Sequence, residues 1–190
     1  MHIYLASKSP RRQSLLQQIN VSFELIDAEI DESPFENELP LDYVNRMAKE
    51  KAIKGWKHIN RTLSLPLLAA DTSVVLKDVI LGKPRDKQNA FEMLNNLAGK
   101  THQVITCVAV VNDNQQHFAQ SITDVSFCEL SPRQIEDYIE QGECLDKAGS
   151  YGIQGYAAKF IQKISGSYSG VVGLPLFETA NLLDSFAPGK

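Results

Sequence analysis

The sequence has few of the residues that mark secreted, zinc-binding or membrane-spanning proteins. It contains three cysteines, Cys107, Cys128 and Cys144, which are too widely spaced for a CxxC pair. An odd number of dispersed cysteines favours reduced thiols and a cytoplasmic location. The four histidines lack the spacing of a metal site. No apolar run approaches the ~20 residues of a membrane span, and we expect neither a signal peptide nor membrane binding.

The sequence also lacks the excess of positive charge that nucleic-acid-binding proteins usually carry. Its formal net charge is −4, so we expect no general nucleic-acid partner. The basic residues instead gather near positions 8–12, 49–57 and 83–87, a distribution that fits a small anionic ligand. We find no repeat, linker or low-complexity tract, and a chain of 190 residues predicts one domain, residues 1–190.

Apolar periodicity predicts a mixed α/β fold, in which a sheet is flanked by helices. Strands are expected near 2–6, 21–26, 66–70, 74–76, 79–81, 101–111, 117–129 and 159–164, and helices near 10–19, 41–56, 86–97, 131–142 and 175–186. Two irregular stretches separate them: an acidic segment, residues 27–38, and a glycine-rich loop, residues 146–155. Ser131 and Gln134 form a capping box, and Gly99 is placed to end a helix.

The first candidate site lies where the first strand turns into the first helix. Ser9 suits the N-cap and Pro10 the first helical position. Lys8, Arg11 and Arg12 crowd a helix N-terminus where the macrodipole is already positive. That arrangement favours a bound anion, and backbone N–H groups beside two arginines suit a phosphate. The alternative is a capped helix whose arginines point to solvent.

Carboxylates form the second candidate group. Asp71 follows the apolar run 67–70, and an acid at a strand end is a common place for a catalytic group or metal ligand. Thr72 beside it offers a hydroxyl. Asp31 and Glu32 lie in the acidic segment, and carboxylates from separate segments can hold Mg²⁺ together with substrate phosphates. The alternatives are an Asx turn at Asp71 and a solvated acidic segment.

Two lysines and one glutamine complete the candidates. Lys83 stands between Gly82 and Pro84, and a rigid loop can present an ammonium to a phosphate. Lys51 follows the apolar spacing of its helix, so its head group can reach the same site or snorkel at the core edge. In the glycine-rich loop, three glycines allow close backbone approach to a ligand. Its glutamine, Gln154, matches a nucleobase edge, although the loop could also be a flexible connector.

Taken in order, these segments resemble the Maf family of nucleoside triphosphate pyrophosphatases. The resemblance spans nearly the whole chain and rests on the segments 7–12, 32, 49–52, 70–72, 82–86 and 146–155, with a last match at 173–175. It implies a Maf/inosine-triphosphatase-like fold: an elongated mixed sheet flanked by helices, with two lobes around a cleft, often in a homodimer.

The glycine-rich loop resembles the branch of the family that hydrolyses dTTP and UTP to the monophosphate and pyrophosphate. By residue matches, the resemblance implies that Asp71 is the catalytic proton acceptor and that Arg11, Thr72 and Gln154 select the substrate. It also implies phosphate contacts at Ser7, Arg12, Lys51 and Lys83, and a divalent cation, Mg²⁺ or Mn²⁺, at Glu32 and Asp71. Lys8 falls at a variable position of the motif. The alternative function is a non-catalytic nucleotide-binding regulator of cell division.

Overall fold

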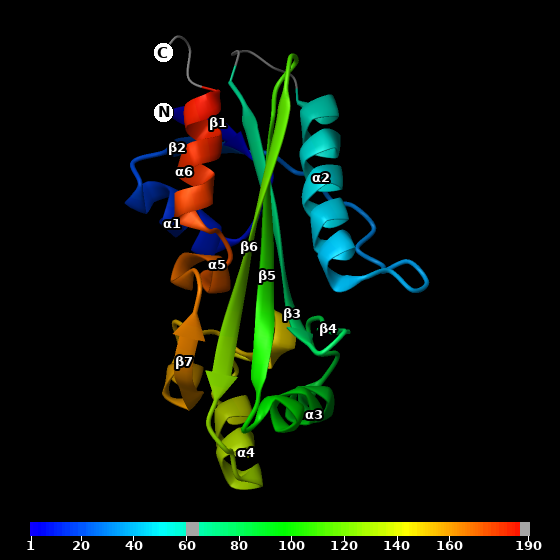
Figure 1. The fold of residues 1–190 in the computed structure, drawn as a ribbon, viewed down its shortest axis with the longest axis vertical. Helices are drawn as coiled ribbons and strands as arrows, with labels where there is room; N and C mark the ends of the chain where they lie inside the picture. Colours follow the sequence, from blue (N-terminus) through cyan, green and yellow to red (C-terminus); the bar gives the residue numbers. More distant parts are fainter. Residues whose placement is uncertain (60–64, 187–190) are drawn as a thin grey trace. The chain divides into compact units, whose positions relative to one another are not determined.

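The computed structural model describes residues 1–59 and 65–186 and contains a mixed sheet flanked by helices, as predicted (Figure 1). The strands run in the order β2-β1-β3-β5-β6-β7, and β4 pairs with β3. Their bounds are β1 His2–Leu5, β2 Ser22–Leu25, β3 Leu67–Leu76, β4 Val79–Leu81, β5 Thr101–Val111, β6 Gln116–Phe127 and β7 Ile161–Ser165. Strand β1 is parallel to both β2 and β3, whereas β3/β4 and β6/β7 are antiparallel.

The helices lie close to their predicted positions. Their bounds are α1 Pro10–Gln18, α2 Pro40–His58, α3 Lys87–Leu97, α4 Pro132–Glu140, α5 Tyr168–Val172 and α6 Leu176–Ser185. The sequence did not predict α5, nor the two 3₁₀ helices η1 (Ala148–Ser150) and η2 (Tyr156–Phe160). Ser9 occupies the N-cap of α1 and Pro10 its first turn, but the Ser9 side chain makes no capping hydrogen bond.

The chain divides into two compact units, each assembled from separate segments. The first unit comprises residues 1–71, 106–121 and those from 173 onward, and the second comprises 72–105 and 122–172. Strands β3, β5 and β6 therefore contribute residues to both units. That the whole chain acts as one domain stays a prediction.

In the first unit, helices lie on both sides of β6. Lys49 and Asn45 of α2 contact Phe118 and Gln120, respectively, whereas His117 accepts or donates a hydrogen bond at Ser185 of α6. Because successive strand residues point to opposite faces, α2 and α6 cover different faces of this strand, as Figure 1 shows. The parallel strand β1 is buried between its neighbours, and the side chains of Ile3, Tyr4 and Leu5 are almost inaccessible.

The second unit has an apolar core of its own. Phe127, Tyr138 and Phe160 are among its largest buried side chains. Helix α4 begins at the predicted capping box: the Ser131 hydroxyl accepts from the Gln134 amide, and the Gln134 side chain accepts from the Ser131 amide. Asp86 caps α3, and Gly99 has the expected positive φ of 65° after that helix. These local signals predicted both helices correctly.

The predicted end of a strand at Asp71 is wrong. Residues 67–76 form one continuous strand, β3, with Asp71 in its interior. The strand pairs with β1 at Leu67 and Leu68 and with β4 from Val74 onward. These two pairings, one on each side of Asp71, hold the backbone extended through it, which removes the alternative of an Asx turn there.

The three cysteines form no disulfide, in agreement with the prediction of free thiols. Cys107 and Cys144 are buried, Cys128 is half-buried, and all three are free. Burial raises the pKa of the Cys107 thiol to about 11, so this thiol stays protonated at neutral pH and is a poor nucleophile.

Candidate functional site

The predicted phosphate-binding turn between β1 and α1 places Arg12 beside Ser7. The Arg12 guanidinium donates one hydrogen bond to the Ser7 hydroxyl (3.2 Å) and another, from Nε, to the backbone oxygen of Gly173 (2.8 Å). Ser7 Oγ also accepts from the Ser9 amide at 3.3 Å. Arg12 is thus anchored along two edges of its guanidinium and does not point freely into solvent, contrary to the alternative of a simple capped helix.

Glu32, Lys51 and Asp71 meet at one point, although they come from three different elements. Lys51 Nζ of α2 lies 2.6 Å from Glu32 Oε1 in the acidic segment and 2.7 Å from Asp71 Oδ1 of β3. The Lys51 and Asp71 side chains are 14% and 13% exposed, whereas Glu32 is 53% exposed. The predicted convergence of the two carboxylates is therefore present, and one ammonium joins them.

Arg12 belongs to the same electrostatic group. Burial lowers the pKa of the Arg12 guanidinium, and the charges of Asp71 and Glu32 act against this shift. An arginine stays protonated in proteins even when desolvated. The neighbouring charge of Arg11 lowers the Arg12 pKa further, so two guanidinium groups share this end of α1. A cationic pair next to two carboxylates gives the first unit donors for a phosphate and oxygens for a cation.

The remaining predicted site residues, Thr72, Lys83 and Gln154, lie in the second unit. Thr72 is half-buried on β3, while Lys83 and Gln154 are exposed. The segment that carries Lys83 is joined to the glycine-rich loop, because the Gly149 amide donates to the Gly82 carbonyl at 3.0 Å. Within residues 1–59 and 65–186, neither Lys83 Nζ nor the Gln154 amide has a side-chain hydrogen bond or ion pair, which leaves both available to a ligand.

The glycines of the glycine-rich loop lie against other side chains of the protein. A Cβ at Gly149 would lie 2.8 Å from Val74 Cγ1, and one at Gly152 would lie 2.8 Å from Lys147 Cε. At Gly155 it would overlap the carboxylate of Glu143. The space beside each glycine is thus filled by the protein itself. Gly149 therefore permits tight packing of the loop on Val74, whereas Gly152 and Gly155 face the ends of the Lys147 and Glu143 side chains. Close approach of a ligand to this loop stays a prediction.

Two buried aromatic contacts, which sequence reasoning missed, anchor this loop. His102 Nε2 of β5 lies 2.7 Å from the Tyr151 hydroxyl, and the Phe127 ring meets the Tyr151 ring at 4.8 Å between centroids. Burial lowers the pKa of His102 to about 4, so its ring is neutral at pH 7. Tyr151 stands three residues before Gln154, and its burial shows that the loop is not a flexible connector.

Tyr43 and Arg46 of α2 are further residues that sequence reasoning did not assign to the site. The Tyr43 hydroxyl donates to the Glu32 carbonyl at 2.9 Å, and Arg46 donates to the Ser33 carbonyl at 3.0 Å. Both fix the acidic segment next to Glu32. Their signal was helical spacing: Tyr43, Arg46 and Glu50 recur at positions that share one face of α2.

Known proteins resemble this chain over nearly its whole length. The profile of the family described as "Maf-like protein" matches residues 2–186. This chain belongs to the Maf family. Two relatives, both named dTTP/UTP pyrophosphatase, come from Nitrosomonas europaea and Alkalilimnicola ehrlichii. The first is 50% identical, covering 96% of this chain and 93% of its own. The second is 48% identical, covering 97% and 93%.

A third relative, from Pasteurella multocida, is also named dTTP/UTP pyrophosphatase and is 47% identical, covering 96% of this chain and 94% of its own. Among solved structures, "The structure of the Staphylococcus aureus Ham1 protein" aligns over 98% of this chain and 97% of its own, at 13% identity and a TM-score of 0.47. Across the described part of the chain, no helix combines the length and the apolar character needed to cross a membrane.

Proposed function

We propose that this Maf family protein hydrolyses dTTP and UTP to the nucleoside monophosphate and pyrophosphate. The observation that carries the proposal is the meeting of Glu32, Lys51 and Asp71 within hydrogen-bond distance, next to the anchored Arg12. The names of relatives that are 47–50% identical over nearly the whole chain support the substrate.

The residues present fit a divalent cation at Glu32 and Asp71. Both carboxylates point at one cationic group, Lys51 Nζ, and carboxylate oxygens are the ligands that Mg²⁺ and Mn²⁺ prefer. The described residues contain no cluster of three or more His, Cys, Asp and Glu side chains that would form an all-protein cage. Two carboxylates suit an ion that takes its other ligands from substrate phosphates and water. When bound, such an ion would neutralise phosphate charge.

We propose separate roles for the candidate site residues. Asp71 takes the proton of the attacking water. The new bond joins the water oxygen to the α-phosphorus, the bond to the bridging oxygen breaks, and pyrophosphate leaves with that oxygen. Ser7, Arg12, Lys51 and Lys83 bind the phosphates and stabilise their developing negative charge. Arg11, Thr72 and Gln154 select the pyrimidine base, for which the free amide of Gln154 offers a donor and an acceptor.

Incubation with a nucleotide panel tests the activity. The purified protein is mixed with Mg²⁺ or Mn²⁺ and dTTP, UTP, CTP, ATP, GTP or 7-methyl-GTP, and the products are identified. Pyrophosphate and monophosphate from dTTP and UTP are expected. Binding without turnover would favour the non-catalytic regulator, and release of orthophosphate would indicate a phosphatase.

We further propose that the protein acts in the cytoplasm, as a homodimer and on free nucleotides.

Asp71→Asn tests the catalytic assignment. This change keeps the shape of the side chain and its place in β3 but removes the base, so turnover is expected to fall by roughly 10²- to 10⁴-fold with the thermal midpoint nearly unchanged. Asp78→Asn, in the exposed turn after β3, is the matched control and should retain full activity. Near-normal turnover in Asp71→Asn would exclude Asp71 as the proton acceptor.

A further inference from the structure

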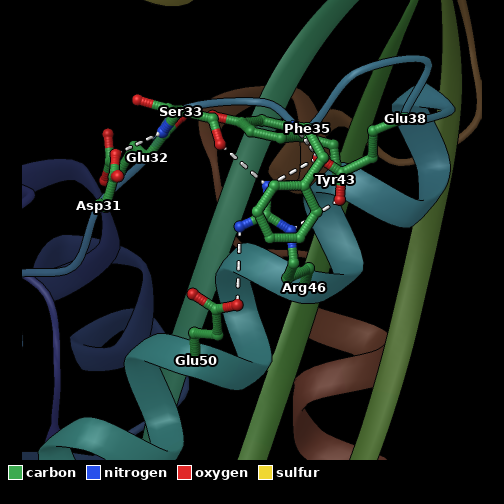
Figure 2. Close-up of polar contacts among 8 residues, drawn as sticks. All are labelled: Asp31, Glu32, Ser33, Phe35, Glu38, Tyr43, Arg46 and Glu50. Atoms are coloured by element: carbon green, nitrogen blue, oxygen red, sulfur yellow. Dashed lines mark hydrogen bonds and ion pairs between the residues drawn. The ribbon is translucent and has the colours of Figure 1, made fainter.

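The acidic segment contains no helix or strand, yet its second half is held in place by side chains of α2 (Figure 2). Arg46 is the centre of this arrangement. Its Nε and NH2 groups each lie 2.6 Å from an oxygen of the Glu38 carboxylate. Two parallel N–H···O bonds of this kind define direction as well as distance. The pair is largely shielded, since the Arg46 and Glu38 side chains are 16% and 7% exposed.

The same guanidinium makes further contacts, among them one over the Tyr43 ring at 5.6 Å from its centre. NH2 donates to the Ser33 carbonyl at 3.0 Å, and the guanidinium carbon lies 3.8 Å from the centre of the Phe35 ring. NH1 lies 3.5 Å from Glu50 Oε1, one turn further along α2. Arg46 therefore contacts the acidic segment at Ser33, Phe35 and Glu38, as Figure 2 shows.

These contacts fix the backbone next to Glu32. Ser33 is its neighbour in the chain, and the Tyr43 hydroxyl holds the Glu32 carbonyl at 2.9 Å. With the backbone fixed immediately after its Cα, at the Glu32 and Ser33 carbonyls, Glu32 can extend its carboxylate to Lys51 at 2.6 Å. An irregular segment without such contacts would spread the carboxylate over many positions, because each unfixed residue keeps its backbone freedom.

We propose that Arg46 is a positioning residue, which fixes the acidic segment through Glu38 and Ser33 and thereby holds Glu32 in place as a cation ligand. Its meaning for catalysis rests on the proposed function. Lysine cannot replace it, since an ammonium is a point charge that cannot form two parallel bonds to a carboxylate and stack on a ring. Within the described part of the chain, Arg46 forms no hydrogen bond or ion pair with Lys51 or Asp71.

Arg46→Lys tests the proposal with two readouts that do not require turnover. Hydrogen exchange reports on the segment, since the Phe35 amide donates to Glu38 Oε2 at 3.0 Å and should exchange faster in the variant. Binding of Mn²⁺ alone, measured by calorimetry, reports on Glu32, and it should weaken about 10- to 100-fold, as for other groups that orient metal ligands. Glu50→Gln removes only the long 3.5 Å contact and should behave as wild type.

A second background separates positioning from a general loss of stability. In Glu32→Gln, where the ligand is already lost, adding Arg46→Lys should weaken Mn²⁺ binding no further. The proposal is overturned by an equal loss in both backgrounds, by unchanged exchange at Phe35, or by a wild-type protein that binds no Mn²⁺. Failure of the proposed function is a different result: the wild type then releases no pyrophosphate, while exchange and Mn²⁺ binding still report on Arg46.

Discussion

The two irregular stretches that carry candidate site residues are fixed by different forces. The acidic segment, with Glu32, is held by charged and polar side chains: the Glu38–Arg46 pair and the Tyr43 hydroxyl. The glycine-rich loop, with Gln154, is held by packing, since Tyr151 and Ile153 are buried and Gly149 lies against Val74. Two stretches that both read as loops in the sequence thus have different physical supports.

The difference predicts different vulnerabilities. A segment fixed by ion pairs loses its order when a charge is removed or when the two parallel hydrogen bonds between a guanidinium and a carboxylate can no longer form. Such a change has little effect on the core. A loop fixed by packing responds to added volume and to protonation of a buried group, and these changes reach the core of the second unit. Substitutions in the two stretches should therefore separate loss of local order from loss of global stability.

The largest effect on the free energy of unfolding is expected for Gly149→Ala. Its φ of +67° is strained for alanine, and the new Cβ would lie within 3.0 Å of three Val74 atoms. Left-handed strain of about 1 kcal/mol plus overpacking of about 2 kcal/mol should lower the free energy of unfolding in urea by about 3 kcal/mol. Val74 is buried on β3 and cannot easily move away.

Gly142→Ala is the matched control for this substitution. Gly142 has a similar φ of +78°, but a Cβ there meets nothing within 4 Å, so only the strain of about 1 kcal/mol should remain. Equal losses in the two variants would mean that the backbone conformation, and not packing on Val74, fixes the glycine-rich loop.

The next largest effect is a pH dependence of stability, which arises from His102 beside the glycine-rich loop. His102 is neutral and buried against Tyr151, and its pKa falls from 6.5 to about 4. Between these values the unfolded state binds more protons than the folded one, so stability falls as the pH is lowered. At pH 5 this loss amounts to about 2 kcal/mol relative to pH 7. His102→Gln removes the titrating group, so unfolding measured at both pH values should show a loss smaller by this amount.

The acidic segment should respond in a lower pH range. The ion pair with Arg46 lowers the pKa of Glu38 from 4.5 to about 2. The contribution of Glu38 to stability is therefore complete above pH 4.5 and is lost as the pH falls from there towards 2.

His58→Gln, at an exposed position of α2, is the control for the His102→Gln variant. If the free energy of unfolding of the wild type were the same at pH 5 and pH 7, His102 would not cause the predicted loss of stability.

Local signals explain what the sequence predicted correctly. The capping box at Ser131, the cap at Asp86 and the left-handed Gly99 each depend on neighbours within four residues, and all three are present. The break predicted at Asp71 was wrong because extension of β3 depends on β1 and β4, which pair on either side of it. The pairing with β1, which is distant in the sequence, has no local signature.

The candidate site shows the same limit. The sequence suggested that Glu32 and Asp71 could share a cation and that the Lys51 head group could reach the same site. It did not indicate that Lys51 pairs with both carboxylates, because all three come from separate elements. Arg46 and His102 were missed for a similar reason. Their partners, Glu38 and Tyr151, lie 8 and 49 residues away, and nothing in the intervening sequence specifies those contacts.

The smallest effect is expected for Lys8→Ala, which tests whether shielding decides the strength of an ion pair. Lys8 Nζ lies 3.2 Å from Asp27 Oδ1 and 2.8 Å from Glu29 Oε1, at the other end of the acidic segment, but all three side chains are at least 67% exposed. Exposed pairs contribute little because water and salt screen them. The thermal midpoint and Mn²⁺ binding should therefore equal those of the wild type within error, in contrast to Arg46→Lys. If Lys8→Ala weakened Mn²⁺ binding as much as Arg46→Lys, the acidic segment would depend on its total charge, and the shielded fork between Arg46 and Glu38 would have no special role.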